Sequence, residues 1–266
     1  VEVNSPEDAE AMFDLLTYEK GGSVLRMLEQ FLGEEEFKDG ISYYLNKHKY
    51  ANTETNDLWD AIEHVTQQPA RRIMDSWIFQ KGYPLVSASI SEDGSTITLS
   101  QDRFLYTEGD EVDTTIWSVP VVMKIGTDSG VEEVRYLLEE RSAEIKLDSP
   151  AVWASANAGG SGFFRARYSP EMLKALSGSM FENLTPIERY GLVDDTWSSV
   201  MAGRTSAMDF LDFARSFRDE TDLDVWTVLS SCLVGLKKLV DGEAELQYKA
   251  VISDLAQPAL DRLGWE

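Results

Sequence analysis

The sequence predicts a multi-domain α+β protein in which a strand-rich middle segment lies between two helical segments. Apolar residues recur at helical spacing up to about residue 82 and again after about residue 170. Between these segments apolar residues alternate with polar ones, which is typical of half-buried strands. The chain has 266 residues, too many for one small domain. We therefore expect three domains, at residues 1–83, 84–169 and 170–266.

The first segment is expected to be helical throughout. Ser5, Pro6 and Asp8 supply a hydroxyl N-cap, a proline at the first helical position and an acid in the first turn. Apolar stripes at helical spacing then predict five amphipathic helices, the last ending near Gly82. The stripes are Ala9, Met12, Phe13 and Leu16; Val24, Leu25, Leu28, Phe31 and Leu32; Phe37, Ile41, Tyr44, Leu45 and His48; Leu58, Trp59, Ile62 and Val65; and Ile73 with Trp77.

The second segment has the period of strands. Turn signals at residues 92–95 and 127–130 separate its apolar runs. Several short strands joined by regular turns predict an antiparallel β-sandwich over residues 84–169. The runs include Ile97 and Leu99; Trp117, Val119, Val121, Met123 and Ile125; shorter ones around Val134, Ile145 and Val152; and a final strand from Phe163 to Tyr168.

The third segment returns to helical spacing. Thr185, Pro186 and Glu188 form a capping box with proline at the first helical position. Short amphipathic helices in succession predict stacked helix pairs of the HEAT or ARM kind. No capping element precedes Trp265 and Glu266, so we expect the chain to be a fragment. The stripes are Leu192, Trp197, Val200 and Met201; Phe210, Phe213 and Phe217; and Val228, Leu229, Cys232, Leu233 and Leu236.

Charge and cysteine content exclude several classes of partner. The formal net charge is -23, spread evenly over the three segments, which disfavours nucleic acid and anionic membrane surfaces. No apolar run approaches the ~20 residues that span a bilayer, and the N-terminus lacks the pattern of a signal peptide. Cys232 is the only cysteine, so we expect a buried structural thiol in a reducing, cytoplasmic environment.

Four stretches carry unusual combinations of residues. They are Thr17-Tyr18-Glu19-Lys20-Gly21-Gly22-Ser23-Val24-Leu25-Arg26-Met27-Leu28; Met74-x-x-Trp77-x-x-Gln80-x-Gly82-Tyr83-Pro84; Gln101-x-Arg103-Phe104 with Asn157 and Gly162-Phe163-Phe164-Arg165-x-x-Tyr168; and Arg189-Tyr190-Gly191-Leu192-Val193-Asp194-Asp195. In this order they resemble the aminopeptidase N family of gluzincin metallopeptidases, most of all its soluble puromycin-sensitive and tricorn-interacting branch. The resemblance implies the helical end of a catalytic domain, a β-sandwich, and the start of an α-helical C-terminal domain.

The resemblance assigns one chemical role, to Tyr18. This residue matches the family tyrosine whose phenol donates a hydrogen bond to the oxyanion of the tetrahedral intermediate, while zinc polarises the carbonyl. A phenol with a pKa near ~10 is protonated at neutral pH and can donate. Without the neighbouring motif, a packing or capping role would be the commoner reading of a tyrosine. Gly21 and Gly22 are expected to permit a close backbone approach or an unusual φ.

The family's zinc motif, His-Glu-x-x-His, is absent from the sequence. The chain has only His48 and His64, neither is followed by glutamate, and they lie on different predicted helices. The Gly-x-Met-Glu-Asn segment that binds the substrate's N-terminus is also missing. We therefore expect zinc only in the parent protein, whose N-terminal half would be the partner of this chain, with peptides as substrates. The isolated chain is expected to be inactive.

Other motifs have structural readings. Residues 159–162 are rich in glycine but open a strand, so a turn is expected instead of a phosphate-binding loop. Arg103 and Arg165 are expected to pair with carboxylates of the sandwich, and Asp194 with Asp195 to be solvated or to cap a helix. Two alternatives stay open: an autonomous, non-catalytic interaction module, and an epoxide hydrolase of the same wider family. Whether residues 1–83 are ordered without their missing half is also open.

Overall fold

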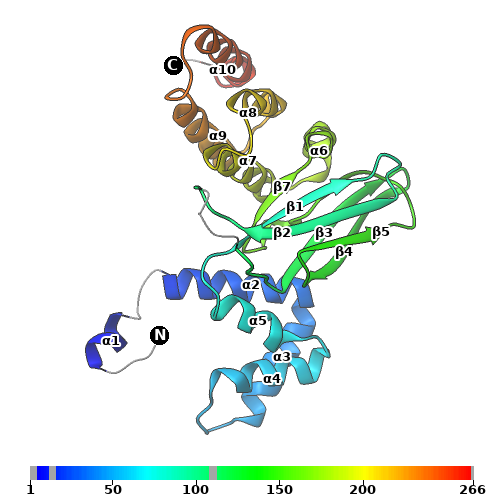
Figure 1. The fold of residues 1–266 in the computed structure, drawn as a ribbon, viewed down its shortest axis with the longest axis vertical. Coiled ribbons are helices and arrows are strands. Elements are labelled where there is room, and N and C mark those ends of the chain that lie inside the picture. Colours follow the sequence, from blue (N-terminus) through cyan, green and yellow to red (C-terminus); the bar gives the residue numbers. More distant parts are fainter. Residues whose placement is uncertain (1–4, 12–15, 108–112, 265–266) are drawn as a thin grey trace.

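The computed structural model describes residues 5–11, 16–107 and 113–264. Met12, Phe13, Trp265 and Glu266, which figured in the sequence predictions, lie outside the described residues. Two helical layers flank a pair of β-sheets (Figure 1). Helices α1 to α5 lie at one end of the molecule, the strands occupy the middle, and α6 to α10 form the other end. The expected order of helical, strand-rich and helical segments is thus confirmed, and the division into separate domains stays a prediction.

The first helical layer covers one end of the strands. Val24, Leu28, Phe31 and Leu32 of α2 are buried, as their spacing predicted. Helix α3 differs, because Gly40 is its only buried residue and Leu45 is exposed. A Cβ on Gly40 would lie 3.1 Å from the side chain of Ile62, so the glycine lets α3 and α4 approach closely. The elements are α1 (Pro6–Ala11), the π-helical turn η1 (Leu16–Lys20), α2 (Gly21–Leu32), α3 (Glu34–Lys47), α4 (Thr55–Thr66) and α5 (Ala70–Ile78).

Two sheets form the middle of the molecule. One has the strand order β5-β2-β1-β7 and the other β4-β3-β6. The prediction of a purely antiparallel arrangement is wrong at one pairing, because β7 runs parallel to β1. The chain passes through the second sheet before it returns to the first, and such a long connection permits a parallel pair. The strands are β1 (Pro84–Ile90), β2 (Thr96–Arg103), β3 (Val119–Thr127), β4 (Gly130–Leu138), β5 (Ser142–Lys146), β6 (Ala151–Ser155) and β7 (Arg165–Tyr168).

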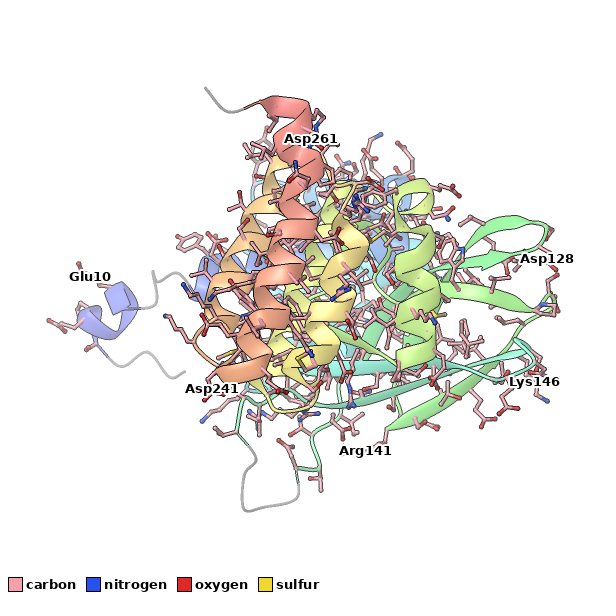
Figure 2. The ribbon with its side chains drawn as sticks, turned by 90° about the horizontal axis from the view of Figure 1, so that it is seen from above. Glu10, Asp128, Arg141, Lys146, Asp241 and Asp261 are labelled. Atoms are coloured by element: carbon pink, nitrogen blue, oxygen red, sulfur yellow. The ribbon has the colours of Figure 1, made fainter. Side chains whose placement is uncertain are left out.

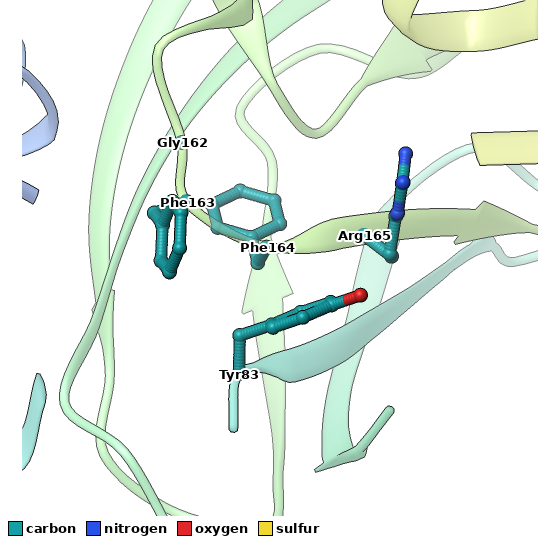
Figure 3. A pocket seen from close by; sticks show the side chains of 5 residues that line it. All are labelled: Tyr83, Gly162, Phe163, Phe164 and Arg165. Atoms are coloured by element: carbon teal, nitrogen blue, oxygen red, sulfur yellow. The ribbon is translucent and has the colours of Figure 1, made fainter. Parts of the chain in front are cut away.

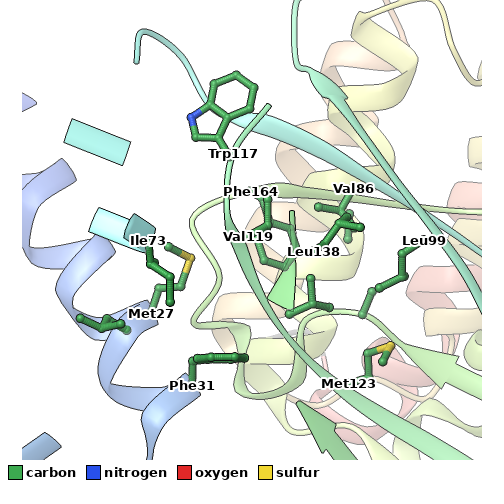
Figure 4. Packing of buried hydrophobic residues seen from close by; sticks show 14 of the residues in the cluster. Met27, Phe31, Ile73, Val86, Leu99, Trp117, Val119, Met123, Leu138 and Phe164 are labelled. Carbon is green, nitrogen blue, oxygen red and sulfur yellow. The ribbon is translucent and has the colours of Figure 1, made fainter. Parts of the chain in front are cut away.

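One hydrophobic cluster joins the first helices to both sheets. It contains Met27 of α2 and Ile73 of α5 together with inward-facing residues of each sheet, such as Leu99 and Met123 (Figure 4). The indole nitrogen of Trp77 donates a hydrogen bond to the Ser118 carbonyl at 3.1 Å, which ties α5 to the segment that leads into β3. Helices and sheets therefore share one core and hold each other in a fixed arrangement.

The second helical layer has its own core. The predicted capping box at Thr185 and Glu188 is present and begins α7. Helices α7 to α10 lie side by side, and the stacking into HEAT-like pairs stays a prediction. No described helix is both long enough and apolar enough to cross a bilayer. The elements are η2 (Ala158–Gly160), α6 (Pro170–Asn183), α7 (Pro186–Met201), α8 (Ala207–Ala214), η3 (Arg215–Phe217), α9 (Leu223–Leu236) and α10 (Gly242–Leu263).

Charged side chains cover the outside of the molecule. Asp128, Asp241 and Asp261 project from its periphery when it is seen from above (Figure 2). Cys232 is buried, and its burial raises the pKa of the thiol to about 12. Such a thiol carries almost no thiolate at neutral pH, which agrees with the structural role expected for it.

Candidate functional site

Tyr18 lies in the π-helical turn η1, which continues directly into α2. Its side chain is 61% exposed. π-Helical turns are rare and are found frequently at functional sites. The tyrosine is therefore a surface residue at the start of a helix whose next turns are anchored in the core, and this geometry suits contact with a molecule outside the chain.

Lys20 fixes the turn that carries Tyr18. Its Nζ donates to the Gln80 carbonyl oxygen at 3.5 Å, just after the end of α5. Partial burial lowers the pKa of this lysine. The Gln80 amide in turn donates to the Ile116 carbonyl at 3.0 Å and to the Ser76 carbonyl at 2.9 Å. A chain of hydrogen bonds thus runs from the turn beside Tyr18, through α5, to the segment before β3.

The two glycines after Lys20 have open space above them. A Cβ built on Gly21 or on Gly22 meets no atom within 4 Å, and neither residue has a positive φ. The expectation that they permit a close approach or an unusual φ is therefore wrong for contacts within this structure. Because η1 runs directly into α2, Gly21 and Gly22 lie within one continuous helical stretch and need no unusual backbone dihedral angles. What the glycines provide is an uncovered strip of backbone next to Tyr18.

Aromatic residues from distant stretches meet behind the site. Trp77 is fully buried, and its ring contacts Trp117 and Phe163. The Phe163 backbone N–H donates to the sulfur of Met27 at 3.3 Å. The sandwich therefore contacts both α2 and α5 directly, and these are the helices that hold the turn with Tyr18.

A small hollow opens beside this cluster. It has a volume of about 260 Å³ and is lined by Tyr83, Gly162, Phe163, Phe164 and Arg165 (Figure 3). Gly162 is required there, because a Cβ on it would lie 2.2 Å from the ring of Phe164. The resemblance residues Gly162 to Arg165 thus build a junction, and they bring no acid, base or nucleophile into the hollow.

Gln101 and Arg103 organise the end of strand β2. The fully buried Gln101 amide donates to the carbonyls of Trp117, Leu138 and Glu140, and its oxygen accepts the Trp117 N–H at 2.9 Å. Arg103 donates to Asp113 at 3.1 Å and to the Lys81 carbonyl. The expected pairing of Arg103 with a carboxylate of the middle segment is confirmed.

Arg165 pairs with a different element from the one expected. Its guanidinium donates to the carboxylates of Asp194 and Asp195 on helix α7, not to acids of the sandwich. Asp195 is buried and also accepts the Ala166 N–H at 3.0 Å, so the reading of these acids as solvated or capping groups is wrong for Asp195. Burial raises the pKa of Asp195 to about 7, although the Arg165 charge opposes the shift. These residues connect the sandwich to the C-terminal helices.

Glu188 of α7 makes a second connection between the C-terminal helices and the sandwich. Its side chain is almost fully buried, forms an ion pair with Lys124 of β3 at 2.7 Å, and accepts the Gly159 N–H at 2.8 Å. Burial opposes its ionisation, but the hydrogen bonds from Lys124, Gly159 and Thr185 outweigh this and lower its pKa. The capping box marked Glu188 as a helix start, and nothing in the sequence marked its contacts across the junction. Gly159 and Gly160 have positive φ and form the expected turn.

The two histidines come from different elements, and both contact tyrosine rings of helix α3. His64 of α4 contacts the ring of Tyr43, and His48 at the end of α3 contacts the ring of Tyr44. In the part of the chain that the structure describes, no three histidine, cysteine, aspartate or glutamate side chains are grouped so as to hold a metal ion. The described residues therefore do not fit a zinc site.

These features define a class of protein: a multi-segment α+β chain whose sandwich braces two helical layers, one of which presents a tyrosine. Sequence comparison matches two segments of the chain to known protein families. The model of the peptidase family M1 domain matches residues 1–77, and that of the ERAP1-like C-terminal domain matches residues 153–266. The first helical segment is thus similar to the peptidase family M1 domain and the C-terminal helices to the ERAP1-like C-terminal domain.

Relatives match nearly the whole chain. The chain is 32% identical to the puromycin-sensitive aminopeptidase of Caenorhabditis elegans, over 90% of the chain and 26% of that protein. Identity is 33% with aminopeptidase M1 of Arabidopsis thaliana, over 100% of the chain and 32% of the relative. The chain is 35% identical to the tricorn protease-interacting factor F2 of Thermoplasma acidophilum, over 89% of the chain and 28% of that protein. The chain thus spans about a quarter to a third of the length of these relatives.

Proposed function

We propose that this chain is part of a zinc aminopeptidase, a cytoplasmic hydrolase that removes N-terminal residues from peptides, and that Tyr18 stabilises the transition state. The observation that carries the proposal is the position of Tyr18, exposed at a π-helical turn within the segment that matches the M1 peptidase domain. Relatives named as aminopeptidases match the chain over most of its length, which supports the reaction class.

Tyr18 would act as a hydrogen-bond donor. When a nucleophile adds to the peptide carbonyl, negative charge develops on the oxygen, and a neutral phenol aimed at that oxygen stabilises it. The donor needs a fixed position, since a preorganised group pays little reorganisation cost during the reaction. The contact between Lys20 and the Gln80 carbonyl supports this role, because it ties the turn to helix α5.

Zinc would be held by residues other than those described, since these do not fit a metal site. When bound, the metal would supply Lewis-acid activation of the carbonyl and of a water molecule. The contribution of this chain would be limited to the phenol donor and to the walls around it. For that reason we propose that the isolated chain does not hydrolyse peptides.

An N-terminal, zinc-binding half would pack against the first helical layer. Phe79 is 79% exposed and Ile78 is 46% exposed at the end of α5, close in sequence to the Gln80 that Lys20 contacts. Large apolar side chains at one end of a helix favour a protein partner over water. In this arrangement residues 1–83 complete the catalytic domain, residues 84–169 brace it, and residues 170–266 begin a helical domain that limits access to peptides.

Replacement of the phenol tests the proposal in the whole protein. Tyr18→Phe removes one hydroxyl and is expected to lower kcat by about 100- to 1,000-fold, the usual effect of losing one oxyanion donor, with little change in KM. Zinc content measured by atomic absorption is expected to stay the same. Tyr50→Phe, at a side chain that is 97% exposed, is the matched control. A Tyr18→Phe enzyme with unchanged kcat contradicts the assigned role.

A further inference from the structure

A groove between α6 and α8 has no role in the proposed aminopeptidase site. It has a volume of about 580 Å³, within the range of ligand-binding sites. One wall is the face of α6 that carries Leu173, Lys174 and Ser177, and the other is the face of α8 that includes Phe213. The two helices lie next to each other beyond the end of β7 (Figure 1).

The groove gathers cations that have no partner. Arg167 and Arg204 line it, and both lack an ion pair and a side-chain hydrogen bond within the described residues. Every other arginine has at least one such contact, although acids outnumber bases 47 to 24 in this chain. Lys174, the third cation of the groove, is also unpaired there. In so acidic a protein, free guanidinium groups in one groove mark a place where a negative ligand fits.

The acids that share the groove are already engaged. Asp209 accepts a hydrogen bond from the Ser206 hydroxyl at 2.7 Å, and Asp212 lies 3.7 Å from Arg215. Both are exposed, whereas Arg204 is half-buried. A half-buried guanidinium without a counter-charge is costly, and a carboxylate that reaches it forms a charge-assisted, two-pronged hydrogen bond.

The rest of the lining favours a peptide over a simple anion. Leu173 and Phe213 give the groove an apolar surface, and Ser177 and Thr205 add hydroxyls that can bond amide groups. A phosphate ion would bind the cations and leave the apolar surface exposed. A peptide segment that alternates carboxylates with apolar side chains would bind the cations and also pack against the apolar surface.

We propose that the α6–α8 groove binds an extended acidic peptide, with carboxylates at Arg167, Lys174 and Arg204 and an apolar side chain on Leu173 and Phe213. The site is separate from Tyr18, because Tyr18 lies in η1, directly before α2, whereas α6 and α8 belong to the C-terminal helices. Binding at this groove does not depend on hydrolytic activity, so the isolated chain serves for the test.

Calorimetric titration of the chain with a short, doubly capped peptide of alternating glutamate and leucine tests the proposal. Binding is expected to weaken by about tenfold or more in Arg167→Gln/Arg204→Gln, which corresponds to a loss of ~1.4 kcal/mol or more. The matched control is Arg26→Gln/Arg135→Gln, which removes the same charge from two exposed surface pairs and is expected to leave Kd unchanged. Far-UV circular dichroism establishes that each variant is folded.

Three further measurements give clear outcomes. A peptide with glutamine in place of glutamate is expected not to bind, and equal affinity for it overturns the proposal. Leu173→Ser is expected to weaken binding of the acidic peptide, because the apolar surface of the groove contributes to the affinity. If inorganic phosphate displaces the peptide at comparable concentration, the groove is an anion site and the peptide proposal is wrong. The proposal is also overturned if Arg167→Gln/Arg204→Gln and the control Arg26→Gln/Arg135→Gln weaken peptide binding equally.

Discussion

Arg165 of strand β7 and Asp195 of helix α7 form an ion pair across the boundary between the sandwich and the C-terminal helices, with Nη1 and Oδ1 3.1 Å apart. The same carboxylate accepts the Ala166 N–H from its other oxygen. One side chain of α7 thus satisfies both a guanidinium and a backbone donor of the last strand. This fixes the direction in which the helical layer leaves the sheet.

Two neighbouring arginines on β7 provide a matched test of that pair. At pH 8.5, where Asp195 is ionised, Arg165→Gln leaves this buried carboxylate without its counter-charge and is expected to lower the free energy of unfolding by about 3–5 kcal/mol. Arg167→Gln, at an exposed residue that has no ion pair or side-chain hydrogen bond among the described residues, is expected to change this free energy by less than ~0.5 kcal/mol. Urea denaturation followed by tryptophan fluorescence measures both. Equal stability of the two variants would remove the structural role assigned to Arg165.

Asp195 also predicts a pH dependence of stability. Its pKa is about 7 in the folded chain because of burial, against about 3.9 for an unfolded aspartate. The folded state therefore holds a proton that the unfolded state has lost between these values. The free energy of unfolding is expected to fall as pH rises from about 4 to about 7, by at most ~1.4 kcal/mol per pH unit from this group.

The Asp195→Asn variant tests this sign. It cannot lose a proton, so its stability is expected to decline less between pH 5 and pH 7.5 than that of the unchanged chain. Urea denaturation at those two values, with Asp128→Asn at an exposed turn as control, gives the comparison. A steeper decline in Asp195→Asn than in the control would show that another group governs this range.

Patterns within one element were readable from the sequence, and contacts between elements were not. The spacing of Val24, Leu28 and Phe31 predicted a buried helical face, because helix period depends only on neighbours in the chain. The Arg165 partner on α7 and the contact of Phe163 with Met27 depend on where distant segments meet. Motif resemblance marked Arg165, Asp194 and Asp195 as notable, and only the structure brings them together.

The same distinction applies to the candidate site. The Tyr18-Glu19-Lys20-Gly21 motif singled out the tyrosine, and the structure puts it on an exposed π-helical turn. The contact of Lys20 with the Gln80 carbonyl could not be anticipated, since the two residues are 60 positions apart in sequence. The open space above Gly21 could not be anticipated either, because it depends on which other elements pack at the start of α2.

Two glycines are expected to respond oppositely to alanine. In Gly162→Ala the new Cβ would overlap the ring of Phe164 at 2.2 Å, so the ring must move and the free energy of unfolding should fall by about 1–3 kcal/mol. Gly178 lies within α6, and a Cβ there meets nothing within 4 Å. Gly178→Ala is expected to stabilise the chain by about 0.5–1 kcal/mol, because alanine is the better helix former.

Thermal unfolding of the two variants checks this pair. The midpoint is expected to fall in Gly162→Ala and to rise in Gly178→Ala relative to the unchanged chain. A Gly162→Ala chain as stable as the original would mean that Phe164 moves aside at no cost, and that the junction beside Tyr83 is looser than the packing indicates.

Lys20 is expected to act on the proposed reaction by positioning Tyr18. Its Nζ contacts the Gln80 carbonyl at 3.5 Å, and Gln80 is held by carbonyls of Ser76 and Ile116. Lys20→Met keeps the length of the side chain and removes the donor. In the whole protein this change should allow the turn to shift and lower kcat by about tenfold, less than the loss of the phenol itself, with a smaller change in KM.

The comparison that separates positioning from folding is a double-mutant cycle. If Lys20 acts through Tyr18, adding Lys20→Met to Tyr18→Phe should cost little further kcat, because the group that it positions is already gone. Independent, additive losses would mean that Lys20 affects catalysis by another route. Lys47→Met on helix α3, an exposed lysine away from this contact, is the control and is expected to leave kcat and KM unchanged. The cycle thus links the hydrogen bond between Lys20 and the Gln80 carbonyl to the chemistry proposed for the phenol two residues away.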